Sequence, residues 1–214
     1  MKVVPPSHIL VNPPASAECL RLLEQAGRVC YKSEDHTKHD SAHVFLERLI
    51  KMGHLSVLEH ISLTVRFICD RGVSHELVRH RLAAYSQEST RYANYSQEKF
   101  GGEITVIKPM FWQEDSPEYQ AWLQAMQETE KAYLSLLRLG ASPQQARSVL
   151  PNSLKTEVFM TANLREWRHI FSLRCAKTAH PQMQEIMLPC LADMHKLLPV
   201  IFMDLWQRFL AGRY

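Results

Sequence analysis

The chain has 214 residues and a formal net charge of +3, with 46% hydrophobic and 22% charged residues. This length suits one larger domain or at most two small ones, with enough apolar residues for a core. The charge is too small to indicate nucleic-acid binding, and no apolar run reaches the length of a membrane span. The five cysteines are widely spaced and form no Cys-x-x-Cys pair, which argues against a disulfide framework or a structural zinc site. This cysteine usage predicts a protein of the reducing cytoplasm.

Hydrophobic periodicity and capping residues predict a mixed α/β fold with few strands and much helix. Strands are expected at 3–4, 9–11, 61–67, 104–107 and 154–161. Helices are expected at 16–26, from 41 to 53, at 73–80, from 116 to 140, from 142 to 147, at 165–174 and at 182–210. Gly27 is expected to end the first helix, residues 70–72 to form a turn and residues 85–97 a loop. Pro189 and Pro199 are expected to break the last helix.

The segment Gly53–His60 places His54, Ser56, Glu59 and His60 in a short bend at a helix end. Two histidines and a carboxylate could bind a metal, but His-x4-Glu-His matches no established zinc pattern. From these residues alone, an ordinary helix end is the favoured interpretation.

A second polar segment runs from Glu76 to Tyr92. Its Arg-His-Arg at 79–81 ends a helix, where basic residues are also simply favourable partners of the helix dipole. The loop that follows is rich in hydroxyl groups and ends near Arg91, which is the chemistry that a phosphate monoester requires. Tyr85 and Tyr92 offer faces on which a base could stack.

The third segment contains Arg147, Asn163, Arg165, His169 and Arg174. The two arginines at 147 and 165 could form surface ion pairs, and Asn163 could cap a helix. His169 lies one turn beyond Arg165, whereas Arg174 lies nine residues beyond it and on another face. No catalytic nucleophile is evident, because the cysteine at 190 falls on an apolar helix face and is expected in the core.

Together these segments resemble the flavin-dependent thymidylate synthases. The family signature is Arg-His-Arg, seven residues and then Ser, which residues 79–81 and Ser89 match. The upstream family pattern His-x-Ser/Thr-x-x-Glu-His matches residues 54–60. The downstream family arginines and asparagine match Arg147, Asn163, Arg165 and Arg174, so the resemblance runs in order from 53 to 186.

The resemblance implies a single domain over 1–214 with a central, mostly antiparallel sheet flanked by helices, the thymidylate synthase-complementing protein fold. It implies a methyltransferase that converts deoxyuridine monophosphate (dUMP) to deoxythymidine monophosphate (dTMP). The carbon donor would be 5,10-methylenetetrahydrofolate, and reduced FAD, recharged by NADPH, would supply the hydride. It further implies a cytoplasmic homotetramer with active sites shared between chains, and no metal, nucleic acid or membrane partner.

The resemblance also assigns residues. FAD would be bound by Ser56, Arg79, His80, Arg81, Gln87, Asn163, Arg165 and His169. The nucleotide dUMP would be bound by Glu76, Arg79, Gln87, Glu88, Ser89, Thr90, Arg91, Arg147 and Arg174. Arg174 would be the catalytic residue, since a guanidinium stabilises negative charge that develops on the uracil ring. The chain departs from many members at Glu76 (Gln), Ala84 (Ser), Ser86-Gln87 (Asn-Glu) and His169 (Asn).

Two alternatives come from other functional classes. The arginine- and tyrosine-containing loop could serve a non-catalytic nucleotide- or RNA-binding protein, although the small net charge and the lack of an RNA-binding motif count against this. A metal-dependent nucleotide hydrolase could use His54, Glu59 and His60, although magnesium sites favour more carboxylates than this segment offers.

Overall fold

The computed structural model describes residues 1–38 and 40–211 and confirms the mixed α/β class. The strands are β1 (Lys2–Val4), β2 (Ser7–Val11), β3 (Ser62–Asp70), β4 (Ala83–Gln87), β5 (Thr105–Ile107) and β6 (Lys155–Asn163). The helices are α1 (Ser16–Tyr31), α2 (Ser41–Lys51), α3 (Arg71–Leu77), α4 (Pro117–Arg138), α5 (Pro143–Ala146), α6 (Leu164–Arg174), α7 (Pro181–Leu197) and α8 (Pro199–Phe209). Short 3-10 turns are η1 (Glu34–His36), η2 (Ser56–His60), η3 (Glu98–Phe100) and η4 (Arg147–Val149).

The chain divides into two compact units, which are described separately. Unit 1 contains residues 1–7, 67–79 and 85–159, and unit 2 contains residues 8–66, 80–84 and the chain from Met160 on. One sheet has the strand order β2-β3-β6-β4, and a second pairs β1 with β5 in parallel. Strands β3, β4 and β6 each contribute residues to both units. The expectation of a single domain stays a prediction.

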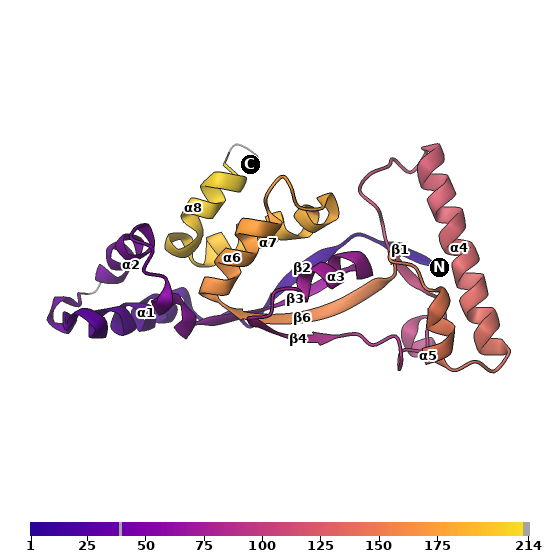
Figure 1. The fold of residues 1–214 in the computed structure, drawn as a ribbon, viewed down its shortest axis with the longest axis horizontal. Coiled ribbons are helices and arrows are strands. Elements are labelled where there is room, and N and C mark those ends of the chain that lie inside the picture. Colours follow the sequence, from indigo (N-terminus) through magenta and orange to yellow (C-terminus); the bar gives the residue numbers. More distant parts are fainter. Residues whose placement is uncertain (39, 212–214) are drawn as a thin grey trace. The chain divides into compact units, whose positions relative to one another are not determined.

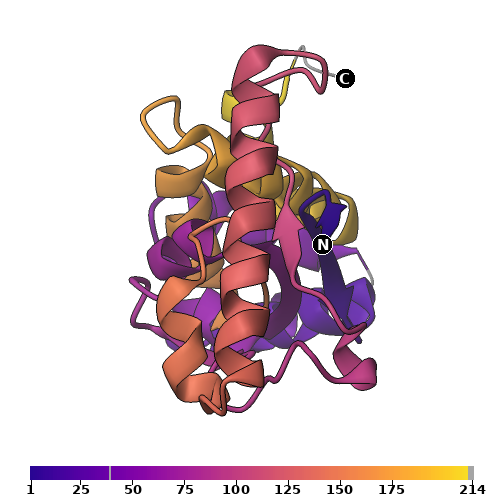
Figure 2. The ribbon, with the colours of Figure 1, turned by 90° about the vertical axis from the view of Figure 1, so that its right-hand side faces the viewer.

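Unit 1 is built on the long helix α4, which lies beside α5 (Figure 2). The Ser116 hydroxyl accepts a hydrogen bond from Tyr119 N at 3.2 Å, and Pro117 occupies the first turn, so the start predicted from Ser-Pro is confirmed. The fully buried Tyr133 of α4 packs with Ile104, Val106 and other apolar side chains. This cluster fixes β5 against the helix.

Unit 2 has its core under α6, α7 and α8, which pack against one another (Figure 1). Trp167 and Phe171 of α6 are fully buried and stack with ring centroids 5.7 Å apart. Phe202 of α8 meets Phe171 edge-on at 5.8 Å. The Trp167 indole donates a hydrogen bond of 3.0 Å to the Leu63 carbonyl of β3, which satisfies its buried N–H. Helix α6, which carries several predicted site residues, is therefore firmly held.

Gly27 does not end the first helix, because α1 continues to Tyr31. A Cβ atom at Gly27 would lie 2.6 Å from Phe45 Cε1, closer than carbon atoms can approach. The glycine is therefore required for the close packing of α1 on α2, the two neighbouring helices in Figure 1. A glycine within a helix and one at its end give the same sequence signal.

Three further local predictions were wrong. Residues 70–72 form no separate turn, because Asp70 caps α3 by accepting a hydrogen bond from Val73 N at 2.6 Å. Part of the predicted loop 85–97 belongs to strand β4. Pro189 lies inside the continuous helix α7, whereas Pro199 does begin a new helix, α8. In the described part of the chain, no helix is long and apolar enough to span a membrane.

Candidate functional site

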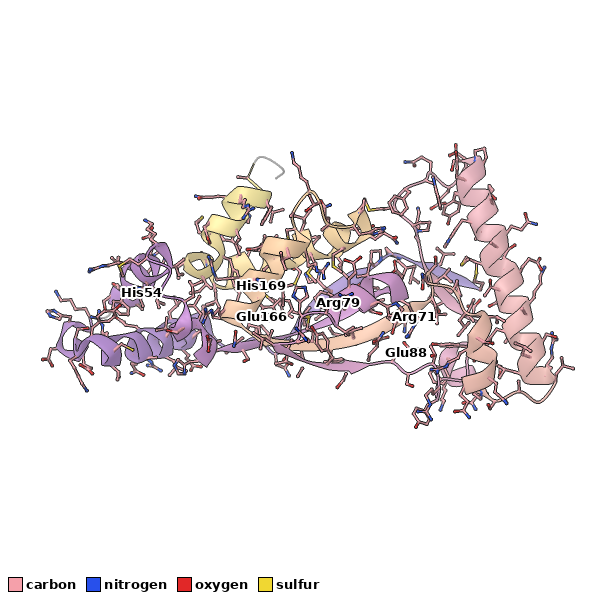
Figure 3. All side chains as sticks on the ribbon, in the orientation of Figure 1. His54, Arg71, Arg79, Glu88, Glu166 and His169 are labelled. Carbon is pink, nitrogen blue, oxygen red and sulfur yellow. The ribbon has the colours of Figure 1, made fainter. Side chains whose placement is uncertain are left out.

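In unit 2, the imidazole of His80 lies among Arg174, Glu166 and His169; Figure 3 labels the last two on α6. Arg174 Nε donates a hydrogen bond of 2.9 Å to His80 Nε2. The rings of His80 and His169 meet edge-on with centroids 5.9 Å apart. Because a guanidinium can only donate, Nε2 is the acceptor and the ring proton is placed on Nδ1. Nδ1 faces Glu166 Oε1 at 3.6 Å.

This geometry keeps His80 uncharged at neutral pH. Burial, then the neighbouring Arg174 and His169, lowers its pKa from 6.5 to about 4. The close approach to Glu166 is therefore not an ion pair at pH 7. A protonated ring would repel the guanidinium, whereas the neutral ring accepts its hydrogen bond and orients it. His80 thus holds Arg174 in one position.

The local sequence of α6 explains how these groups meet. Asn163 caps the helix by accepting a hydrogen bond from Glu166 N at 2.9 Å, as predicted. Glu166 and His169 are three residues apart and so lie on one face of the helix. Arg174 is the last residue of α6. Glu166 was missed in the sequence, although its spacing from His169 was visible.

The atoms of His80, Glu166 and His169 lie within 4.8 Å of one another, a spacing that could hold a metal ion. The guanidinium of Arg174, however, donates to His80 Nε2 and brings a positive charge to the same point. A cation there would face electrostatic repulsion, so the cluster suits an anionic or electron-rich ligand better.

Four of the residues predicted to bind FAD line two adjoining pockets of unit 2. The first, of about 730 Å³, contains Asn163, Arg165 and His169, and the second, of about 300 Å³, contains Ser56. The two pockets share Leu55 and Arg165. The other lining residues of the first pocket are Glu59, Leu82, Glu166, Arg168 and Ser172, none of them among the residues assigned by resemblance. We call these two cavities the α6 pocket and the Ser56 pocket. Arg81 is exposed in the segment before β4.

The residues proposed for a hydrolytic metal site do not gather in the described chain. Arg165 Nη1 contacts Glu59 Oε1 at 2.6 Å, and Tyr31 Oη lies 2.7 Å from His54 Nδ1. Among the described residues, only His80, Glu166 and His169 have ligand atoms close enough together to hold one metal ion. This arrangement weakens the hydrolase alternative.

In unit 1, Gln87 of β4 is tied to the protein through its amide group. Its Nε2 donates to Ser74 Oγ at 3.0 Å and to Thr156 Oγ1 at 3.2 Å. Two hydroxyl partners use both hydrogens of the amide. Gln87, which stands where many family members have glutamate, is therefore held by two hydroxyl groups of this chain.

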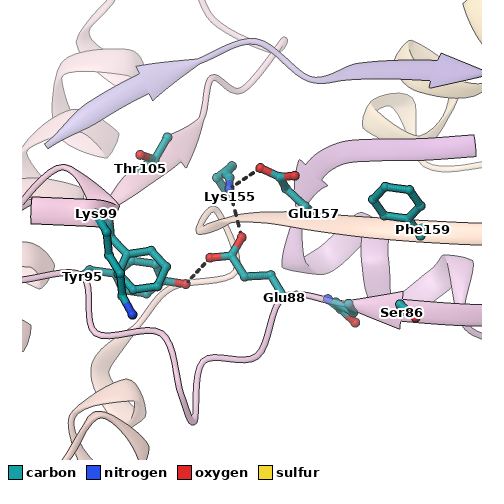
Figure 4. Close-up of a pocket in the computed structure, with 10 residues that line it drawn as sticks. Ser86, Glu88, Tyr95, Lys99, Thr105, Lys155, Glu157 and Phe159 are labelled. Carbon is teal, nitrogen blue, oxygen red and sulfur yellow. Dashed lines mark hydrogen bonds and ion pairs between the residues drawn. The ribbon is translucent and has the colours of Figure 1, made fainter. Parts of the chain in front are cut away.

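Glu88 is held by its neighbours in a pocket of about 620 Å³ (Figure 4). Tyr95 donates a hydrogen bond of 3.0 Å to one carboxylate oxygen, and Lys155 donates one of 2.9 Å to the other. Glu88 N also donates to the Glu157 carbonyl at 2.9 Å. Burial opposes the charge of Lys155, but hydrogen bonds and charges from Glu88 and Glu157 outweigh it and raise the pKa of Lys155. Tyr95 and Lys155 were not identified from the sequence.

The loop after Glu88 brings Thr90 to Arg147. Arg147 Nη1 lies 3.4 Å from Thr90 Oγ1, and Thr90 is buried. Ser89 Oγ accepts a weak hydrogen bond of 3.3 Å from Arg91 N, while the Arg91 side chain is exposed. Ser89, Thr90 and Arg147 are thus grouped in unit 1. In the same unit, Glu76 lies in α3 and the exposed Arg79 follows it.

Two of the five cysteines, Cys69 and Cys190, are poorly suited to act as nucleophiles, whereas Cys30 is exposed. Cys190 is fully buried, as predicted, and burial raises the pKa of its thiol well above the usual value. Burial also raises the pKa of Cys69 to about 12. Both groups stay protonated at neutral pH and are poor nucleophiles.

The fold and these pockets define an α/β protein whose arginine- and histidine-containing cavities suit polar, anionic small molecules. Residues 15–200 match the family model described as "Thymidylate synthase complementing protein". The flavin-dependent thymidylate synthase of Pyrococcus abyssi is 35% identical over 79% of this chain and 70% of its own. That of Geobacter sulfurreducens is 35% identical over 87% of this chain and 82% of its own. The chain therefore belongs to the family of flavin-dependent thymidylate synthases, which confirms the resemblance.

A solved structure supports the same fold. The UMP/dUMP methylase PolB of Streptomyces cacaoi, crystallised with 5-Br dUMP, superposes with a TM-score of 0.77 and 23% sequence identity. The match covers 100% of this chain and 99% of that one.

Proposed function

We propose that this chain converts dUMP to dTMP, with 5,10-methylenetetrahydrofolate as carbon donor, reduced FAD as hydride source and NADPH as the reductant of the flavin. The proposal is supported above all by Arg174, which donates a 2.9 Å hydrogen bond to the neutral His80 and is oriented by it. Both residues lie in the segment that the family model matches. A fixed guanidinium that cannot lose its proton is suited to stabilise an electron-rich pyrimidine.

The chemistry adds a methylene carbon to C5 of uracil, releases the C5 proton and reduces the methylene group to methyl. Arg174 would bind the uracil carbonyl edge and stabilise the negative charge that builds up while the new carbon–carbon bond forms. Bound FAD supplies, in its reduced form, the hydride for the last reduction. The buried thiols of Cys69 and Cys190 agree with a reaction that uses no cysteine nucleophile.

The residues of the α6 pocket and the Ser56 pocket fit a flavin. Asn163, Arg165, His169 and Ser56 supply amide, guanidinium, imidazole and hydroxyl groups for the polar ring edge and the diphosphate. Leu55 and Leu82 supply apolar surface for the ring faces. Family resemblance adds Arg79, His80, Arg81 and Gln87 to the proposed FAD residues.

Within unit 1, a group of polar residues would bind the phosphate and sugar of dUMP. Ser89, Thr90, Arg91 and Arg147 supply hydroxyl and guanidinium groups suited to a phosphate. Glu76, Arg79 and Gln87 remain proposed contacts of the nucleotide. Since both carboxylate oxygens of Glu88 already have partners, we propose that Glu88 positions the loop that begins at Ser89.

Purified protein tests this function directly. The expected result is a yellow protein, or one that becomes yellow with added FAD, which releases tritium from [5-³H]dUMP only with methylenetetrahydrofolate and NADPH present. A colourless protein that takes up no added FAD would contradict the proposal. FAD uptake without folate-dependent tritium release would instead favour the non-catalytic nucleotide-binding alternative.

We further propose a cytoplasmic homotetramer in which neighbouring chains complete each active site. The assignment rests on the family resemblance. Light scattering after gel filtration should give four times the mass of 24.8 kDa. Two differently inactivated variants should regain part of their activity when mixed, and a monomer that is fully active would refute the shared site.

A further inference from the structure

Unit 2 contains a third cavity, of about 560 Å³, between α1, η1 and α2, which the proposed FAD and dUMP sites do not use. We call it the α1–α2 pocket. Its apolar and aromatic wall consists of Tyr31, Val44, Phe45, Leu49 and Met52. Its polar groups come from Arg28, Ser33, His36, Ser41, Arg48 and His54. The volume lies within the range of about 300–1,000 Å³ that small-molecule sites usually have.

The inner wall of the α1–α2 pocket is preorganised by a buried ion pair. Arg28 donates from Nε and Nη2 to Glu24 Oε1, at 2.8 and 2.5 Å, and its guanidinium lies 4.6 Å from the centre of the Phe45 ring. Ser41 donates a further hydrogen bond of 2.6 Å to the same oxygen of Glu24. The charge of Arg28 is thereby neutralised, and Phe45 is fixed in place as a flat apolar surface.

Arg48 is the remaining strong cation of the α1–α2 pocket. It is exposed, and no carboxylate contacts its side chain among residues 1–38 and 40–211. An arginine beside an apolar wall suits a ligand that combines an aromatic ring with a carboxylate, because guanidinium and carboxylate pair in a bidentate manner.

The α1–α2 pocket adjoins the Ser56 pocket, which adjoins the α6 pocket. Tyr31, Leu49 and His54 line both it and the Ser56 pocket, which in turn shares Leu55 and Arg165 with the α6 pocket. The Tyr31 and His54 rings are stacked, 6.5 Å apart with 15° between their planes, at the junction. Because the pockets adjoin, a long ligand that lies across Tyr31 and His54 would have one end beside the proposed flavin site and the other near Arg48.

We propose that the α1–α2 pocket binds the p-aminobenzoyl-glutamate tail of the folate substrate. The benzoyl ring would lie against Phe45 and Met52, and a glutamate carboxylate would pair with Arg48. The inference rests on the proposed function, which requires a folate whose reactive ring reaches the flavin. It adds the surface that recognises the other end of that substrate.

Two folates and two arginine variants test the assignment. The substrates are 5,10-methylenetetrahydrofolate and methylenetetrahydropteroate, which lacks the glutamate. Arg48→Ala should raise the KM for the complete folate about tenfold and leave the KM for the truncated one unchanged. Arg21→Ala removes an exposed arginine of α1 that does not line the pocket and should change neither value. Equal effects of Arg48→Ala on both folates, or no effect on either, would overturn the assignment.

A binding measurement separates failure of this inference from failure of the proposed function. Calorimetry with p-aminobenzoyl-glutamate needs no turnover, and binding should be lost in Arg48→Ala but kept in Arg21→Ala. If wild-type protein takes up no flavin but binds this fragment as described, the function fails and the pocket assignment stands. If wild-type protein is active yet binds no fragment and Arg48→Ala is normal, the pocket assignment fails alone. A change in oligomeric state with unchanged folate KM would show an interface between copies and would also overturn it.

Discussion

Acidification should destabilise the protein through His80, and the magnitude follows from its environment. The folded-state pKa of about 4 lies below the ordinary value of 6.5, so the unfolded chain binds the proton more tightly. Stability from this residue is complete above pH 6.5 and is lost as the pH falls towards 4. At pH 4.5 the expected loss, relative to pH 7.5, is about 2.5 kcal/mol.

The variant His80→Gln isolates this effect because glutamine can still accept from Arg174 and donate towards Glu166 but does not titrate. Urea unfolding at pH 7.5 and 4.5 gives the free energy of unfolding for wild type and variant. The pH-dependent loss should be smaller by about 2.5 kcal/mol in His80→Gln. His75→Gln removes an exposed histidine and should keep the wild-type loss. An identical pH dependence in wild type and His80→Gln would refute the neutral, buried His80.

Four other substitutions give distinct outcomes. Lys155→Met should lower the free energy of unfolding by about 2 kcal/mol and raise the KM for dUMP, because the partly buried Glu88 loses its cation. Tyr95→Phe removes only a neutral hydrogen bond to Glu88 and should lower the free energy of unfolding by about 1 kcal/mol. Equal losses of the two variants in urea unfolding would count against this ranking. Gly27→Ala should lower stability by about 1–3 kcal/mol, since its Cβ would meet Phe45 at 2.6 Å, and an unchanged thermal midpoint would disprove that close packing. Cys190→Ala should keep flavin binding and tritium release within about twofold of wild type, because a buried protonated thiol takes no part in the chemistry; an inactive but folded variant would reveal a nucleophile.

The sequence predicted those elements whose signals are local. The Ser116-Pro117 start of α4, the alternating pattern of β3 and the Asn163 cap of α6 all depend on residues close in the chain. Gly27 was wrongly predicted to end the first helix, because the need for glycine there comes from Phe45 of another helix, which packs against it. The helix α7 passes through Pro189 because its packing outweighs the loss of one backbone hydrogen bond.

In the candidate site, too, features with a local sequence signal were predicted and long-range contacts were not. The order of the motifs predicted the family, and the spacing on α6 placed His169 near Arg165, which the α6 pocket brings together. The hydrogen-bond partners that hold the site residues in place could not be predicted from motif order or helical spacing. Glu88 is held by Tyr95 and Lys155, and Arg174 contacts His80, which is 94 residues away. Such contacts depend on how distant segments pack and leave no periodic signal.

In the proposed reaction, Arg174 acts on the uracil ring while other residues bind the flavin. The most direct measurement is tritium release from [5-³H]dUMP by Arg174→Ala, with the flavin absorbance recorded on the same sample. The expected result is a normal flavin spectrum with weakened dUMP binding and tritium release reduced at least about 100-fold. Wild-type tritium release by this variant would contradict the role assigned to Arg174.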